Sequence, residues 1–123
     1  MLEDLSIELV ETEKQCRVLV ANLKGRFDAF SSIATRERLD QSLDEGIVNF
    51  IINLSETVFL DSAGMAVLVS LLNRARRIEG DVKLTWPKDQ TAHLILNLAR
   101  FDRVFEITDS VEVALQSFEK RCV

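Results

Sequence analysis

The sequence has few residues that break regular structure and no long apolar segment. Its 123 residues include only four glycines and one proline, a composition that argues against disorder or low complexity. The longest apolar stretches are far shorter than the roughly 20 residues of a transmembrane helix, and neither a charged leader nor a signal-type segment follows Met1. We therefore expect a cytoplasmic protein that does not contact a membrane.

Residues that bind metals or perform catalysis are equally scarce. The chain has two cysteines, Cys16 and Cys122, and a single histidine, His93. A structural zinc site needs about four such ligands, so we expect no metal. His93 falls among apolar residues of a predicted helix, and the sequence contains no phosphate-binding glycine loop. These absences predict no cofactor and no catalytic residue, and hence a protein that is not an enzyme.

The two cysteines are interpreted as packing residues. A cytosolic chain keeps its thiols reduced as a rule, although the sequence leaves open a disulfide between Cys16 and Cys122.

The charge balance also argues against two classes of partner, unless the chain has a local basic patch. Acidic residues outnumber basic residues 20 to 15, which gives a formal net charge of -5. Such a chain has no general electrostatic footprint for nucleic acid or for an anionic membrane. Its length and its 47% hydrophobic content instead fit one globular domain spanning residues 1–123.

The hydrophobic pattern predicts an N-terminal hairpin followed by alternating helices and strands. The predicted strands are 6–13, 16–23 (ended by Gly25), 47–54, 82–86 and 104–107. The predicted helices start at Ser31 or Ser32, at Ser62, at Gln90 and at a capping box of Asp109 with Glu112. This order predicts a single α/β domain with a mixed sheet of about five strands and about four helices. The core should contain Val18, Val20, Ile51, Leu54, Leu68 and Leu72.

One turn stands out as a candidate functional site. Asp61 and Ser62 lie where a buried strand meets the most regular of the predicted helices, so that Ser62 begins this helix. A helix N-terminus tolerates an added anion, and phosphorylation would add about -1.5 to -2 charges beside Asp61, with Asp28 and Glu56 as further acidic neighbours. The alternative is that Asp61 or Ser62 is simply an N-cap residue.

Three segments carry a family resemblance. LDSAGMAVL at 60–68 resembles the D-S-[ST]-G-[LIM] motif of the STAS domain, as found in bacterial anti-sigma factor antagonists. KGRFDAFSS at 24–32 is similar to the G-[ED]-[LF]-D segment of that family, and LARFDRVFEI at 98–107 is similar to the end of its third helix and its last strand. Three motifs in the family's order make the resemblance specific.

This resemblance implies a phosphorylation switch. Ser62 would be the phosphoacceptor, with Asp61, Asp28, Ala63 and Gly64 as its neighbours. The implied partners are an anti-sigma factor that is also a serine kinase, a PP2C-type phosphatase and, indirectly, the sigma factor that is released.

The chain also departs from the family pattern. Ala63 replaces a frequent Ser or Thr, Ala66 replaces a common Gly, and Arg100 with Phe101 replaces a common Gly-Leu.

We further expect Met65 and Ala66, early in the same helix, to form an exposed apolar patch that contacts the partner. The protein should be a monomer or a weak dimer.

The sequence leaves three alternative functions open. They are a STAS-like accessory or scaffold subunit of a transporter or larger signalling assembly, a phosphorylation-controlled binder with another output, and a small hydrolase. The last lacks a positioned base in the sequence.

Overall fold

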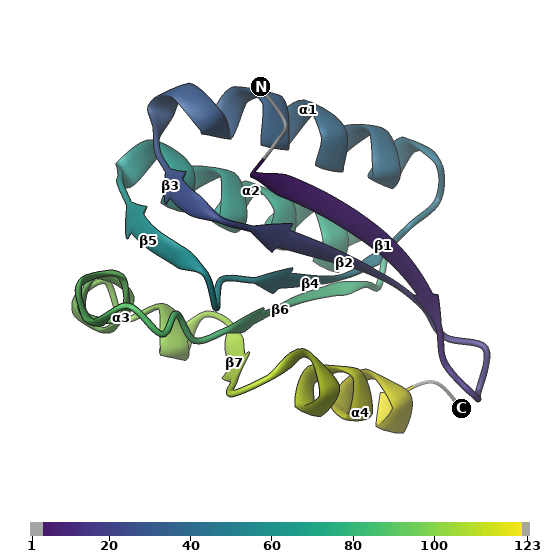
Figure 1. Cartoon of the computed structure of the whole chain (residues 1–123). Helices are drawn as coiled ribbons and strands as arrows, with labels where there is room; N and C mark the ends of the chain where they lie inside the picture. The colour runs from purple at the N-terminus through teal and green to yellow at the C-terminus, as the bar shows by residue number, and fades with distance from the viewer. Residues whose placement is uncertain (1–3, 122–123) are drawn as a thin grey trace.

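A five-stranded mixed sheet lies at the centre of the computed structural model, which describes residues 4–121 (Figure 1). The strands are β1 (Leu5–Glu11), β2 (Arg17–Leu23), β4 (Asn49–Asn53), β6 (Asp81–Thr85) and β7 (Glu106–Thr108). They are arranged in the order β1-β2-β4-β6-β7. The β1–β2 hairpin is antiparallel, whereas the pairs from β2 to β7 are parallel. The predicted mixed sheet with an N-terminal hairpin is confirmed.

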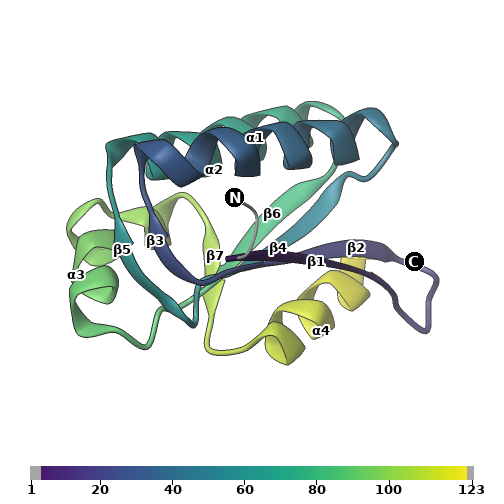
Figure 2. The same ribbon diagram turned by 45° about the horizontal axis from the view of Figure 1, so that its top comes forward.

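Helices cover both faces of this sheet. Within residues 4–121 there are four α-helices: α1 (Ala29–Asp44), α2 (Ser62–Arg77), α3 (Gln90–Leu98) and α4 (Val111–Arg121). Helices α1 and α2 lie side by side on one face, α4 covers the other, and α3 packs against a short strand at one end of the molecule (Figure 2). The predicted α/β architecture is therefore confirmed.

The central strands read as continuous apolar runs because they are buried on both faces. In β4, Phe50 and Ile52 belong to the cluster under α1 and α2, whereas Ile51 faces the cluster under α4. All six predicted core residues are buried. Leu54, Leu68 and Leu72 lie in the first cluster, and Val18, Val20 and Ile51 lie in the second.

A second, two-stranded sheet was missed by the sequence analysis. We predicted that Gly25 ends a strand, but the chain continues into β3 (Gly25–Phe27), which pairs in parallel with β5 (Thr57–Leu60). Gly25 has φ +75°, a conformation that L side chains rarely adopt. This bend directs β3 away from β2 and towards β5.

Two predicted helix caps are wrong, by three or four residues in α1 and by one residue in α4. Helix α1 begins at Ala29 with Asp28 as its N-cap, so neither Ser31 nor Ser32 caps it. Helix α4 is capped by Ser110 rather than Asp109, because the Ser110 hydroxyl accepts a hydrogen bond from the Val113 N–H at 3.2 Å. In both cases a neighbouring polar residue with an equal capping propensity has the required position.

Arg100 and Phe101, which depart from the family pattern, lie in a tight turn before the last strand. Arg100 has φ 57°, a left-handed conformation that glycine adopts more easily. A 3₁₀ turn, η1 (Phe101–Arg103), follows, and the rings of Phe101 and Phe105 pack 5.2 Å apart. The last strand therefore starts at Glu106, two residues later than predicted.

The remaining predictions concern the cysteines and the membrane. Cys16 is buried under α4, whereas Cys122 lies outside the described residues. Among the helices of residues 4–121, none combines the length and apolar character that crossing a membrane requires.

Candidate functional site

Two parallel strands end side by side, each at an aspartate. In the β3–β5 pair, Phe27 is in register with Leu60, and both side chains are buried. Asp28 directly follows β3 and Asp61 directly follows β5, and each is the N-cap of the next helix. The predicted neighbours Asp28 and Asp61 are thus brought together from segments 33 residues apart.

Asp28 closes the first turn of α1. Its Oδ1 accepts hydrogen bonds from the backbone N–H groups of Phe30 and Ser31, each at 3.1 Å. The Ser31 hydroxyl accepts in return from the Asp28 N–H at 3.0 Å, which completes a capping box. The Ser31 N–H makes the largest contribution to holding the pKa of the Asp28 carboxyl below its usual value; desolvation opposes it, and Arg26 also lowers the pKa.

Asp61 links the two helices. Its Oδ1 accepts from the Gly64 N–H at 3.0 Å and so caps α2, whereas its Oδ2 accepts from the Ala29 N–H of α1, also at 3.0 Å. The Asp61 N–H points back to the carbonyl oxygen of Phe27 at 3.4 Å. One carboxylate therefore fixes the relative position of both helix N-termini, and the interpretation of Asp61 as an N-cap residue is confirmed.

Ser62 is the first residue of α2 and is exposed. Within residues 4–121, its hydroxyl has no hydrogen-bond partner, and neither do the backbone N–H groups of Ser62 and half-buried Ala63. Backbone N–H groups of this kind, at the positive end of the helix dipole, favour a nearby anion. The site therefore offers a free hydroxyl next to two free donors.

Gly64 is required by close packing. A Cβ atom at this position would lie 2.4 Å from the carbonyl oxygen of Phe27. Since that oxygen is backbone at the end of β3, it cannot move aside cheaply. Gly64 thus lets α2 start directly against β3.

The predicted partner-binding residues have different environments. Ala66 is exposed, whereas Met65 is half-buried and packs on the core under α1 and α2. The larger exposed side chains at this end belong to α1: Phe30 is 84% exposed and Ile33 is 64% exposed. Ile33 thus faces solvent although it is apolar.

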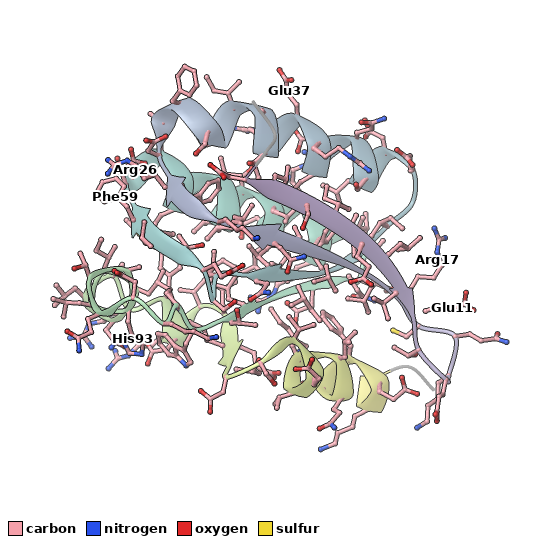
Figure 3. The ribbon with its side chains drawn as sticks, in the orientation of Figure 1. Glu11, Arg17, Arg26, Glu37, Phe59 and His93 are labelled. Atoms are coloured by element: carbon pink, nitrogen blue, oxygen red, sulfur yellow. The ribbon has the colours of Figure 1, made fainter. Side chains whose placement is uncertain are left out.

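Two further sequence expectations are corrected or located. Glu56 was expected near Ser62, but it precedes β5, at the opposite end of the strand from Asp61, and its carboxylate lies 3.7 Å from Lys24 Nζ. His93 lies on α3, where its ring stacks on Trp86 with centroids 4.4 Å apart (Figure 3). Among the described residues, no three His, Cys, Asp or Glu side chains are grouped to hold a metal ion.

One contact was not foreseen. The Arg26 guanidinium lies over the Phe59 ring, 4.2 Å from its centroid, and its Nε is 3.5 Å from Asp28 Oδ2 (Figure 3). The spacing of Arg26 and Asp28, two residues apart, could have indicated side chains on the same side of a strand. The pairing of β3 with β5 was needed to find Phe59.

Comparisons with known proteins agree with this architecture. A family model described as the STAS domain matches residues 10–114. The chain belongs to the STAS domain family. A curated relative from Thermotoga neapolitana, named "Putative anti-sigma factor antagonist TM1081 homolog", is 26% identical over 82 residues, which are 67% of this chain and 72% of the relative.

Several solved structures show the same fold. The "putative anti-sigma factor antagonist (tm1081)" of Thermotoga maritima has a TM-score of 0.78 at 18% identity, over 90% of this chain and 92% of the other. The Bacillus cell fate determinant SpoIIAA in its phosphorylated form has a TM-score of 0.67 at 17% identity, over 92% and 99%. A sulfate transporter family protein from Wolinella succinogenes has a TM-score of 0.68 at 19% identity, over 92% and 90%.

Proposed function

We propose that this STAS protein is an anti-sigma factor antagonist of the cytoplasm, and that phosphorylation of Ser62 ends its binding to an anti-sigma factor that is also a serine kinase. The observation that carries this proposal is the exposed Ser62 hydroxyl, which has no partner among the described residues and stands at the start of α2. A PP2C-type phosphatase would remove the phosphate and restore binding.

The phosphorylated form should remain folded. The kinase transfers the γ-phosphoryl group of ATP to Ser62 Oγ, releasing ADP and the hydroxyl proton. The dianion then lies near the free N–H groups of Ser62 and Ala63, and a helix N-terminus stabilises such a charge by about 0.3 to 2 kcal/mol. This contribution offsets repulsion from Asp28 and Asp61.

Binding, in contrast, should be lost. Exposed apolar side chains occur on three elements of this part of the molecule. Besides Phe30 and Ile33 on α1 they include Val58 on β5, and Leu94 and Leu98 on α3, which packs against β5. A partner seated on these side chains, and on Met65 and Ala66, would dehydrate Ser62. An unpaired charge buried in such an interface costs several kcal/mol.

Affinity capture followed by mass spectrometry tests the proposal directly. Wild-type protein and Ser62→Ala are used as baits, with and without ATP. The wild type should lose a kinase-like partner when ATP is present and carry phosphate on Ser62, whereas Ser62→Ala should keep the partner. Stoichiometric phosphate elsewhere, or full affinity of the phosphorylated protein, would contradict the proposal.

The docking surface is tested with the captured partner. Ala66→Glu and Phe30→Ser should each weaken binding at least tenfold in a titration, because one introduces a charge and the other removes a large apolar contact. Val113→Ser is the matched control, since Val113 is an exposed apolar residue on α4, on the other face of the sheet. Unchanged affinity in both test variants would refute this surface.

A second candidate is an accessory or scaffold subunit of a transporter or larger signalling assembly. The similarity to the Wolinella succinogenes protein favours it. In that case capture would yield transporter or scaffold subunits, and ATP would not release them. Neighbouring genes for a kinase-like anti-sigma factor and a phosphatase would support the first candidate instead.

A further inference from the structure

Two different contacts hold the Arg26 side chain on β3, just before the start of α1. Its guanidinium lies 4.2 Å from the centroid of the Phe59 ring, and its Nε lies 3.5 Å from Asp28 Oδ2. The side chain is still 64% exposed, so other groups can reach it. Arginine pairs well with carboxylates and phosphates and stacks on aromatic rings.

The register of β3 and β5 explains this position. Arg26 lies opposite Phe59, and the next pair, Phe27 with Leu60, is buried. Because side chains alternate along a strand, Arg26 and Phe59 share the outward face. In Figure 3 these two side chains lie together beyond the ends of β3 and β5.

A short series of contacts leads from Arg26 to Ser62. Arg26 pairs with Asp28, and Ala29, the next residue, donates its N–H to Asp61 Oδ2 at 3.0 Å. Asp61 directly precedes Ser62. The guanidinium is therefore connected to the acceptor serine through both aspartates.

The other charged groups nearby do not balance these aspartates. Lys24 and Asp4 line a small hollow of about 20 Å³ together with Arg26, but Lys24 Nζ pairs with Glu56 at 3.7 Å. Among residues 4–121, Arg26 is thus the cation that pairs with Asp28, whose neighbour Ala29 binds Asp61. Once Ser62 carried a phosphate, this guanidinium would face two carboxylates and a dianion.

We propose that Arg26 is the counter-ion of phosphorylated Ser62, and that it turns from Asp28 towards the phosphate when Ser62 is modified. This role rests on the proposed function only in requiring a phosphate on Ser62. Asp28 would keep its hydrogen bonds from Phe30 and Ser31, so the cap of α1 survives the exchange. A phosphate dianion offers the guanidinium a stronger, bidentate partner than the single contact to Asp28.

The test is a ³¹P NMR titration of the full chain with phosphoserine incorporated at position 62 during translation. The second pKa of a phosphoserine is about 6, and a nearby cation lowers it. Arg26→Ala should therefore raise this pKa by about half a pH unit, less than the shifts of 1 to 3 units that close charge pairs can produce. Arg26→Lys should raise it by a smaller amount, because charge is kept but the planar group is lost.

Lys24→Ala is the matched control, because it removes the same charge two residues away. It should leave the pKa of the phosphate nearly unchanged. No rise in Arg26→Ala, or an equal rise in Lys24→Ala, would overturn the proposal. A purely structural clamp between β3 and β5 would not move this pKa.

A second measurement needs no variant. The Nε–H proton of Arg26 should shift downfield in the phosphorylated wild type relative to the unmodified protein, and an unchanged signal would count against the exchange. Because no kinase is used, the two proposals fail separately. If Arg26→Ala raises the phosphate pKa but phosphorylation does not release the partner, only the proposed function is refuted. If phosphorylation releases the partner but Arg26→Ala leaves the phosphate pKa unchanged, only the role of Arg26 is refuted.

Discussion

The β3–Asp28–α1 and β5–Asp61–α2 segments are two versions of the same strand–cap–helix unit. Their cap residues have nearly identical backbones, with φ -117° and ψ -173° at Asp28 and φ -117° and ψ -176° at Asp61. The difference lies at the third helical residue, which is Ser31 in α1 and Gly64 in α2. Ser31 completes a capping box, whereas Gly64 has no side chain to do so.

This difference leaves fewer hydrogen bonds at the start of α2 than at the start of α1. In α1, the N–H groups of Ala29, Phe30 and Ser31 all have acceptors, and the Ser31 hydroxyl donates to the carbonyl oxygen of Arg26 at 2.9 Å. In α2, of the first three N–H groups only that of Gly64 is bound to an acceptor within residues 4–121. A serine at an incompletely capped helix start keeps its hydroxyl available for modification.

The largest expected effect is on phosphate incorporation. In a kinase assay with the captured partner, Ser62→Ala should abolish incorporation, because Ala63 offers no second hydroxyl. Ser31→Ala should be phosphorylated at close to the wild-type level, because the Ser31 hydroxyl is already used in the cap. Phosphosite mapping that finds Ser31 modified would reverse the comparison.

Adding the missing side chain to α2 should be costly. Gly64→Ser should lower the free energy of unfolding by about 2 kcal/mol, within the range for overpacked sites, because its Cβ would meet the Phe27 carbonyl oxygen. Ala63→Ser is the control and should change stability by less than about 0.5 kcal/mol. Urea denaturation measures both, and equal stabilities would show that α2 can shift away from β3.

Replacing the two serines by alanine should also lower the free energy of unfolding by different amounts. Ser31→Ala should cost about 1 kcal/mol, because it removes half of a capping box. Ser62→Ala should cost less than about 0.5 kcal/mol, since its hydroxyl is bound to none of residues 4–121. If urea denaturation gave the same loss for both, the Ser62 hydroxyl would have a structural role.

The smallest effect concerns acid stability. The pKa of Asp28 is lowered in the folded protein, so its contribution is present above the unfolded value of 3.8 and is lost as the pH falls through the folded value. Asp28→Asn keeps a capping acceptor but cannot titrate, and its stability should therefore fall less steeply below about pH 4. Asp44→Asn, which removes an exposed carboxylate at the other end of α1, is the control.

Much of the fold could be predicted because its signals are local. Asp61 and Ser62 were placed at the start of α2 since a buried strand changes there to helical spacing. Lys83 shows the limit of alternation: apolar and polar residues alternate over 82–86, yet the Lys83 side chain is only 3% exposed. It is accommodated by Glu106 at 3.2 Å and by the Phe118 ring at 4.7 Å, partners that lie more than 20 residues away.

The surroundings of the site could not be predicted because they depend on contacts between distant segments. The three residues of β3 are too few to show a pattern, and only their pairing with β5 brings Arg26 to Phe59. The same holds for Ile33, which has apolar character but lies on the outer side of α1. Helix periodicity alone does not state which side a neighbouring helix covers.

The hydrogen bond from Ala29 to Asp61 has a practical consequence for following the modification. Amide hydrogen exchange at Ala29 depends on whether the Asp61 carboxylate keeps its place, although Ala29 lies 33 residues from Ser62 in the sequence. A phosphate that pulls Asp61 aside would deprotect this single amide while the rest of α1 stays protected. The first amide of one helix thus reports on the chemical state of the other.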